Sequence, residues 1–242
     1  MDEILEDIKK IESEQIDYHK LSDDYFGVNE GKIPILISAP HGARHLRFSQ
    51  KDGSLWKEED EYTASMAIKL GELTGAHVIY VKNKTIEDPN FEEVSKYKFA
   101  IKQIVEKEQI KFLADIHGAD KNNTFNIDVG IIDEKDMKQC SCPKLKPVIE
   151  RSLIKFQNPL FNQKFNASHL GTITYFARHV CGIESAQFEI NAKYRIIERK
   201  SDASKAIKGV EPDYKADRKD VMAMFNHLKE MILNIKEKVE TR

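Results

Sequence analysis

The sequence has few cysteines, no long apolar run and almost no excess charge of either sign. Its 242 residues include 38 basic and 40 acidic side chains, a formal net charge of -2. Such a balance lacks the broad positive field that non-specific nucleic-acid binding uses. No apolar run approaches the ~20 residues that a membrane span requires, and the first 15 residues are charged throughout. We therefore expect a soluble, unexported protein with no nucleic-acid or membrane partner.

The cysteines do not form a recognisable framework. Cys140 and Cys142 are separated by a single residue and Cys181 is left over, a pattern that fits neither a disulfide scaffold nor the Cys-x-x-Cys spacing of a metal site. Free thiols in a reducing cytoplasm are the simplest interpretation. The chain also lacks repeats, Gly/Ser linkers and low-complexity tracts, so we expect residues 1–242 to form one domain.

The chain alternates between short β-branched runs and segments of helical periodicity. The predicted strands are 33–38, 76–81, 110–118, 125–132 and 183–191. The predicted helices are 3–16, 59–75, 91–108, 172–180 and 217–238, with one more inside 142–157. Segment 172–180 also fits a strand. Because the first strands alternate with helices, the pattern indicates an α/β fold with a mostly parallel or mixed sheet.

Two histidines stand where strands of the predicted sheet end. His41 follows strand 33–38 in Pro-His-Gly, and His117 lies at the end of strand 110–118 in Asp-Ile-His-Gly. Ligands of open α/β sheets bind at the carboxyl ends of the strands, and zinc takes imidazole nitrogens together with a carboxylate. The pair therefore indicates a metal site. The alternative is that each histidine is an ordinary hydrogen-bonded loop residue.

Carboxylates accompany the histidines. The acidic run 58–61 can supply a metal ligand, or it can serve only the dipole of the helix that follows. Glu189 lies inside an apolar strand, where a carboxylate is costly unless it is paired, protonated or used. Beside a metal it is a natural general base, and the alternative is a buried salt bridge. Asp88 and Asn90 bring polar groups to the same rim, or form a plain turn.

Six short motifs, in this order, resemble those of the N-formylglutamate amidohydrolase family, a relative of the zinc carboxypeptidases and aspartoacylases. The motifs are PHGA at 40, EEDEY at 58, DPNF at 88, DIHG at 115, GTIT at 171 and QFEI at 187. The resemblance covers residues 33–195 and implies a zinc carboxypeptidase-like, three-layer α/β architecture.

The resemblance also implies residue roles. His41 and His117 match its zinc ligands, and Glu189 matches its catalytic carboxylate. The acidic zinc ligand of the family aligns best with Glu61, and less well with Asp60 or Glu59.

One position departs from the family pattern. Asp88 and Asn90 match a turn that lines the substrate pocket, but Phe91 stands where the family has an arginine. The arginines that can replace it as a carboxylate clamp are Arg44, Arg47, Arg178 and Arg195. We predict catalytic roles for Arg44 and Arg195 and substrate binding for Arg178, although each can equally be a surface residue.

Further side chains can meet the substrate. Tyr194 can donate a hydrogen bond to an oxyanion, or it can be a tyrosine at the edge of the core. His169 and His45 can polarise a carbonyl, and we favour His169, which precedes Gly171.

Together these features predict a zinc-dependent hydrolase that cleaves an amide bond of an N-acyl amino acid or a related small, anionic amide. The alternatives are a peptidase or γ-glutamyl hydrolase of the same fold, and a binding protein that keeps the fold without turnover. A metal-independent esterase has no support, because the chain has no Gly-x-Ser-x-Gly motif.

Overall fold

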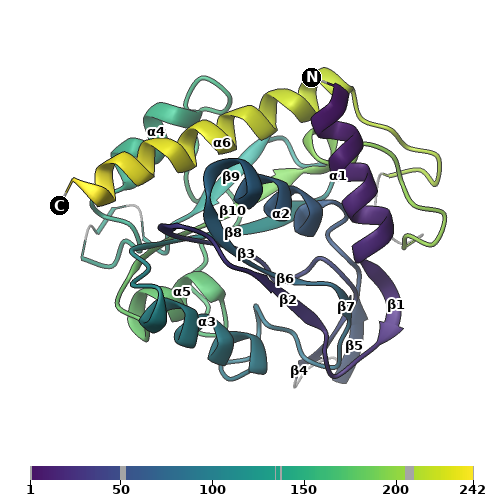
Figure 1. The fold of residues 1–242 in the computed structure, drawn as a ribbon, viewed down its shortest axis with the longest axis horizontal. Helices are drawn as coiled ribbons and strands as arrows, with labels where there is room; N and C mark the ends of the chain where they lie inside the picture. The colour runs from purple at the N-terminus through teal and green to yellow at the C-terminus, as the bar shows by residue number, and fades with distance from the viewer. Residues whose placement is uncertain (1, 50–52, 134, 137, 205–209, 242) are drawn as a thin grey trace.

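Helices cover both faces of a central β-sheet (Figure 1). The computed structural model describes residues 2–49, 53–133, 135–136, 138–204 and 210–241. The helices are α1 (Asp2–Gln15), α2 (Thr63–Thr74), α3 (Lys96–Lys107), α4 (Lys146–Leu153), α5 (Ile173–His179) and α6 (Arg218–Glu240). Helices α1, α2, α4 and α6 lie on one face of the sheet, and α3 and α5 lie on the other. The predicted helix–sheet–helix layering is confirmed.

The central sheet is mixed. Its strands are β2 (Phe26–Asn29), β3 (Ile33–Ala39), β6 (Ala76–Val81), β8 (Phe112–Ala119), β9 (Ile127–Gly130) and β10 (Glu184–Asn191). Their order is β2-β6-β3-β8-β10-β9. The four inner strands run parallel to one another, whereas the edge strands β2 and β9 are antiparallel to their neighbours.

The inner strands are buried on both sides. Ile35, Leu36 and Ile37 of β3 have no solvent exposure, and Phe112 and Leu113 begin β8 in the same state. A parallel strand covered by helices on both faces needs apolar side chains at every position, which is why these strands read as continuous rather than alternating apolar runs. Polar residues are therefore displaced to the carboxyl ends of β3, β8 and β10.

Two helices begin later than their periodicity predicts. Helix α2 begins at Thr63 rather than at residue 59, because Tyr62 adopts a left-handed φ of 69° that ends the preceding turn. The acidic run 58–61 thus lies before the helix and not in its first turn. Helix α3 begins at Lys96, where the Ser95 side chain caps it by accepting a hydrogen bond from the backbone N–H of Lys98. Val94 is accordingly 87% exposed and is not on the buried helix face.

Several other predictions about elements are confirmed. Gly75 ends α2 with a φ of 81° and donates its N–H to the carbonyl of Gly71. The ambiguous segment 172–180 is helical, since α5 is capped by the Thr172 side chain. Pro147 lies in the first turn of α4, where a proline is tolerated.

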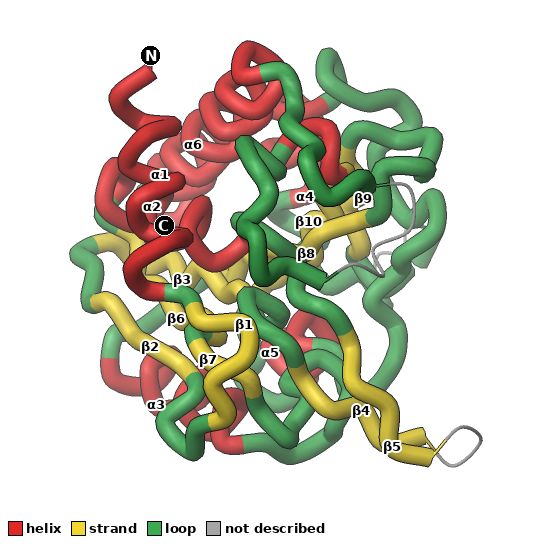
Figure 2. Tube along the Cα trace, turned by 90° about the vertical axis from the view of Figure 1, so that its right-hand side faces the viewer, coloured by secondary structure: helices red, strands yellow, loops and turns green. Residues whose placement is uncertain are grey.

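Four short strands were not predicted. They are β1 (Asp17–Leu21), β4 (His45–Ser49), β5 (Gly53–Lys57) and β7 (Asn83–Lys84). Strands β4 and β5 pair as an antiparallel hairpin that projects from the body of the molecule (Figure 2). Strand β2 of the central sheet was not predicted either, because its short FGVN sequence has neither a long apolar run nor strict alternation. None of the helices within the described ranges is long and apolar enough to cross a bilayer.

Candidate metal centre and active site

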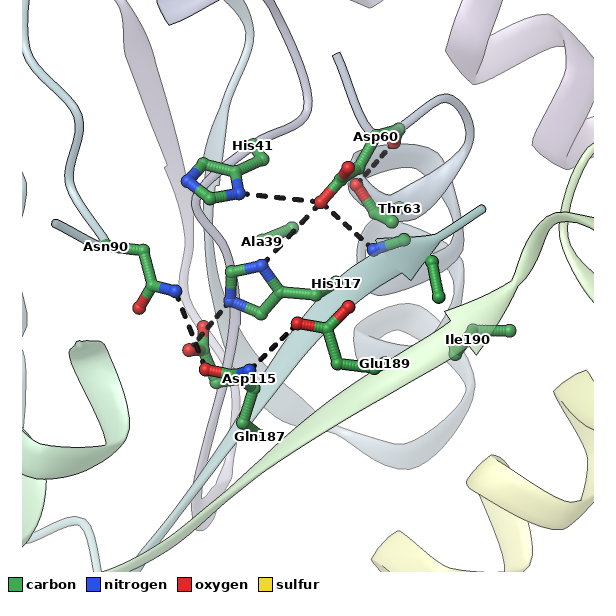
Figure 3. A network of polar contacts seen from close by, with 12 residues as sticks. Ala39, His41, Asp60, Thr63, Asn90, Asp115, His117, Gln187, Glu189 and Ile190 are labelled. Atoms are coloured by element: carbon green, nitrogen blue, oxygen red, sulfur yellow. Dashed lines mark hydrogen bonds and ion pairs between the residues drawn. The ribbon is translucent and has the colours of Figure 1, made fainter. Parts of the chain in front are cut away.

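His41 and His117 meet at the carboxyl edge of the sheet. β3 and β8 are parallel neighbours, so the residues at their carboxyl ends lie side by side. The Nδ1 atoms of His41 and His117 are 3.5 and 3.6 Å from the same oxygen, Oδ2 of Asp60 (Figure 3). The two rings lie edge to face with their centroids 4.8 Å apart. The expectation that the histidines converge is confirmed.

Asp60 is held in place by backbone contacts with both strand ends. Its N–H donates to the carbonyl of His41 at 2.7 Å, and its Oδ2 accepts the N–H of Gly118 at 3.0 Å. Its own carbonyl accepts the N–H of Thr63, the first residue of α2. These hydrogen bonds tie the turn 58–62 to β3, β8 and α2. They place the Asp60 carboxylate between the two imidazoles.

Each histidine has a second carboxylate on its other nitrogen. Nε2 of His41 lies 3.0 Å from Oδ1 of Asp88, and Nε2 of His117 lies 2.9 Å from Oδ2 of Asp115. Both aspartates are fully buried. A carboxylate on one ring nitrogen fixes the orientation of the ring and raises the basicity of the other nitrogen. Both Nδ1 atoms are thus presented to the space beside Asp60.

The cluster shifts the pKa values of its members. Burial opposes a charge on His117, yet Asp115 and Asp60 together raise its pKa well above the usual value. Burial opposes a charge on His41 as well, and Asp88 and Asp60 outweigh it and raise the pKa. Burial alone would raise the pKa of Asp60, but hydrogen bonds and charge interactions with the two histidines hold it well below the ordinary range. The carboxylates around His41 and His117 therefore favour a positive charge between them.

The donor set suits a metal ion. The offered atoms of His41, Asp60 and His117 all lie within 4.8 Å of one another. Two imidazole nitrogens and a carboxylate are a ligand set of catalytic zinc sites, and buried carboxylates behind the histidines are typical of them. A second group, His41, His45 and Asp88, is equally compact. It suits a cation less well, because Asp88 already accepts hydrogen bonds from His41 and from Arg47.

Glu189 lies beside this cluster. It is paired in register with His117 of the neighbouring strand and is 7% exposed. The side-chain amide of Gln187 donates to its Oε1 at 2.8 Å (Figure 3). Burial raises the pKa of Glu189 to about 7, against the opposing effect of His117. A carboxyl group that titrates near neutrality next to a cation site has the properties of a general base.

Two cavities meet at the cluster. One, of about 530 Å³, extends toward Leu55 and Trp56 of the β4–β5 hairpin. The other, of about 520 Å³, extends toward the loop 164–169 and contains Glu189. The residues that line both are His41, Arg47, Asp60, Gly118 and Asp120. A ligand thus has room on either side of the histidine pair.

Among the predicted substrate-binding residues, Asn90 and His169 line the second cavity. The Asn90 side-chain oxygen accepts the N–H of Ile173 at 2.7 Å, which ties the DPNF turn to the GTIT segment. Nδ1 of His169 accepts the N–H of Gly171 at 3.0 Å. An added methyl group at Gly171 would lie 1.7 Å from the carbonyl oxygen of Phe91, so this contact requires glycine.

Asp88 is brought to the site but does not face the cavities. Its two oxygens contact His41 and Arg47, and its side chain has no solvent exposure. These contacts place Asp88 behind the histidine, and its predicted role in substrate binding stays a prediction.

Glu61, the acidic ligand predicted from the sequence, is not placed with the histidines; the residue of the acidic run 58–61 that lies beside them is Asp60. The carboxylate of Glu61 lies 3.0 Å from Nε of Arg199, and both side chains are buried. Burial raises the pKa of Glu61 to about 7, opposed by Arg199. Adjacent residues of an irregular turn point in different directions, and the contacts of Asp60 with both strand ends determine that Asp60 is the one that reaches the histidines.

Three further predicted residues lie elsewhere. Arg44 lines neither cavity, and its Nε donates to Glu59 at 2.9 Å. Arg178 lies in the last turn of α5, where its charge acts on Glu184 at the opposite end of β10. The Tyr194 ring packs edge to face on Phe156 at 5.1 Å, on the side of α6. The structure therefore does not bring these three side chains to the cluster, and their predicted roles stay predictions.

Arg195 does border the first cavity, but it is 2% exposed. Its Nε donates to the carbonyl of Ile190 at 3.2 Å, and its Nη1 donates to the carbonyl of Glu61. An added methyl group at Gly118 would lie 2.5 Å from its Cζ. Arg195 therefore packs beneath Gly118 and braces the turn that carries Asp60.

Sequence reasoning missed Asp115 and Gln187 as members of the site. A signal was present, because each lies two residues before a recognised site residue on the same strand, and side chains two apart share one face of a strand. Asp115 therefore points the same way as His117, and Gln187 the same way as Glu189.

Comparison with known proteins supports the fold. No protein-family model and no curated protein matches the sequence. N-formylglutamate amidohydrolase from Ralstonia eutropha is similar in structure, with 11% identity, a TM-score of 0.56 and coverage of 90% of this chain and 99% of that one. The gene product Atu2144 of Agrobacterium tumefaciens has 13% identity, a TM-score of 0.57 and coverage of 89% and 94%. A carboxypeptidase A-like protein of Shewanella denitrificans has 10% identity, a TM-score of 0.52 and coverage of 97% and 68%.

These likenesses establish a carboxypeptidase-like hydrolase fold. The resemblance to N-formylglutamate amidohydrolase and its relatives, predicted from the order of six motifs, is confirmed at the level of the fold.

Proposed function

We propose that this protein is a zinc-dependent amidohydrolase that cleaves an amide bond of an N-acyl amino acid or a related small amide. The convergence of two histidine Nδ1 atoms on Oδ2 of Asp60, with Glu189 on the adjacent strand, carries the proposal. The arrangement lies between two cavities at the carboxyl edge of a hydrolase-type sheet, where ligands of α/β folds bind.

His41, Asp60 and His117 would hold the metal. Their spacing and their buried partners, Asp88 and Asp115, fit a catalytic zinc site. Zinc in such a site supplies Lewis-acid polarisation of a carbonyl and activation of water at neutral pH.

Glu189 moves the proton in this proposal. Ionised, it accepts a proton from the attacking water, and it then returns that proton to the nitrogen of the leaving amine. The amide of Gln187 holds one of its oxygens at 2.8 Å, which keeps the carboxyl group on the cavity side of the strand. A pKa raised to about 7 by burial lets one group perform both transfers near neutrality.

The experiment combines metal analysis with hydrolysis of a panel of amides. Protein purified without chelator is assayed for zinc and tested on N-formyl and N-acetyl amino acids, dipeptides and γ-glutamyl dipeptides by release of free amine. We expect about one zinc per chain. We also expect Glu189→Gln to retain zinc and lose roughly 10²–10⁴-fold in kcat.

Glu184→Gln is the matched control. Glu184 starts the same strand, is partly buried, and accepts backbone N–H groups of Lys144 and Leu145 at the far edge of the sheet. We expect it to keep activity. Absence of stoichiometric zinc together with full activity of Glu189→Gln would overturn the proposal.

A second candidate function is ligand binding without turnover. Phe91 favours this second candidate. It stands where the family that the sequence resembles has an arginine, and the loss of a substrate contact often accompanies the loss of activity. A zinc-loaded protein that binds amides of the panel without cleaving any of them would support this candidate. Cleavage of only the dipeptides or γ-glutamyl dipeptides would instead favour a peptidase or γ-glutamyl hydrolase.

A further inference from the structure

We propose that Arg47, whose guanidinium group lies over the ring of Phe91, binds a carboxylate of the substrate. The inference rests on the proposed function and names the group that selects the substrate. Arg47 lies on β4 and lines both cavities, as do His41 and Asp60. A group bound by it therefore lies within reach of the cluster from either side.

The guanidinium group is held in a defined plane. Its Nε donates to Oδ2 of Asp88 at 2.5 Å. Its Cζ lies 4.8 Å from the centre of the Phe91 ring, which in turn stacks on His169 with centroids 4.9 Å apart. Phe91 therefore serves as the surface on which the arginine rests. An ordered guanidinium loses little further conformational freedom when it binds a ligand.

The outer edge of the guanidinium remains available. Among the described residues, only Nε of Arg47 has a hydrogen-bond partner, and the side chain is 29% exposed. The N–H groups on Nη1 and Nη2 match the spacing of two carboxylate oxygens, and such paired hydrogen bonds are stronger than neutral ones. The outer edge of Arg47 thus fits a carboxylate.

The other cations near the cluster are engaged elsewhere. Arg195 donates to backbone carbonyls beneath Gly118, and Arg44, which lines neither cavity, donates to Glu59. Nζ of Lys164 donates to the side chain of Asn123 at 2.8 Å. Lys57 borders only the first cavity. Among the arginines and lysines that the structure describes, Arg47 alone combines an ordered guanidinium with a place on both cavities.

The test measures binding of two probes that differ in charge. N-acetyl-L-glutamate carries carboxylates, and N-acetyl-L-glutaminamide is its neutral diamide. Affinities are measured by calorimetry on zinc-loaded protein in the Glu189→Gln background, where turnover does not consume the probes. We expect Arg47→Gln to weaken binding of N-acetyl-L-glutamate roughly 10–100-fold and to leave binding of the diamide unchanged. Arg47→Lys restores only part of the affinity, because an ammonium group cannot form the paired contact.

Arg44→Gln is the matched control. It removes an arginine whose Nε is also held by a carboxylate but which lines neither cavity. We expect the ratio of the two affinities to change less than about threefold, as for other surface substitutions. Zinc content is measured for every variant, because loss of zinc from Arg47→Gln would indicate that the arginine serves only to hold Asp88.

Several outcomes overturn the assignment of Arg47. They are equal weakening of both probes, loss of zinc, wild-type binding that does not depend on the carboxylates, and a fall in kcat with unchanged KM on any substrate that the panel identifies. The outcomes also separate this inference from the proposed function. Arg47-dependent binding of the carboxylate probe in a protein without hydrolysis leaves the inference standing and defeats the function. Hydrolysis with a KM that does not depend on Arg47 leaves the proposed function standing and defeats this inference.

Discussion

Asp60 and Glu61 are adjacent acidic residues that enter two different buried clusters. Asp60 lies between His41 and His117 and borders both cavities. Glu61 points behind the turn, where both of its oxygens contact Arg199. The first cluster is open to ligands through both cavities. The second is closed, since Arg199 also donates to the carbonyls of Val210 and Ser204.

The difference shows that burial and charge alone do not identify a site. Burial raises the pKa of Glu61 and of Glu189 to about 7 in each case. Only Glu189 faces a cavity that also contains the histidines. The closed cluster joins the turn 58–62 to Ser204 and Val210, whereas the open cluster directs two histidine nitrogens toward one carboxylate oxygen beside the cavities.

The largest effect on stability is expected from breaking the closed cluster, which consists of Glu61 and Arg199. Arg199→Met leaves Glu61 buried without a charged partner, which should lower the free energy of unfolding by about 3–5 kcal/mol. Urea unfolding followed by circular dichroism measures the change in metal-free protein. Arg151→Met, on the exposed side of α4, should cost less than about 0.5 kcal/mol. Equal stability of the two variants would show that the Glu61–Arg199 pair is dispensable.

The next effect concerns metal binding. Asp60→Asn should weaken zinc affinity at least roughly 100-fold, because a neutral amide replaces a charged ligand at a site built for positive charge. Glu61→Gln should change it by less than about threefold. Competition with a chromophoric chelator measures both. The reverse order of effects would return the role of acidic ligand to Glu61.

The pH dependence of activity separates the two glutamates of raised pKa. As a base, Glu189 must be ionised, and its pKa is raised to about 7. Lowering the pH through 7 therefore protonates it, and kcat/KM should fall about tenfold per pH unit on the acid side. Glu61→Gln should leave this acid limb in place. If that variant abolished the limb, the titrating group would belong to the closed cluster.

The smallest effect is expected from the carboxylates behind the histidines. Asp115→Asn should weaken zinc affinity about tenfold, because it removes the partner that orients His117 and raises its basicity. The same chelator competition measures it. Glu59→Gln, which removes the acceptor for Arg44, serves as the control and should retain the affinity of the wild type. Unchanged zinc binding in Asp115→Asn would mean that His117 is oriented by packing alone.

The sequence carried enough information for the inner sheet and for the pairing of the histidines. Strands buried on both faces need continuous β-branched and apolar runs. The sequences of β3, β6, β8 and β10 contain such runs, which predict these strands. Parallel neighbours bring their carboxyl ends together, so His41 and His117 were expected to meet. The short edge elements escaped prediction because β1, β4 and β7 bury few side chains and have little periodicity.

The direction of each side chain outside regular structure was decided by tertiary contacts. Within the run 58–61 the composition offers four equivalent carboxylates, and no period distinguishes them. Tyr62 at a φ of 69° and the hydrogen bonds of Asp60 with His41 and Gly118 select one of them. In the same way, the sequence does not distinguish the candidate arginines from one another. In the structure Arg44 donates to Glu59, the charge of Arg178 acts on Glu184, and Arg47 donates to Asp88.

By itself the sequence determined an α/β sheet with two histidines and a buried glutamate at one edge, because strand burial and strand period are local properties of the chain. The tertiary structure alone decided that Asp60, and not Glu61, lies between the two histidines and that Arg47 lines both cavities. Those choices depend on contacts between segments far apart in the sequence, which constrain irregular turns that local periodicity leaves free.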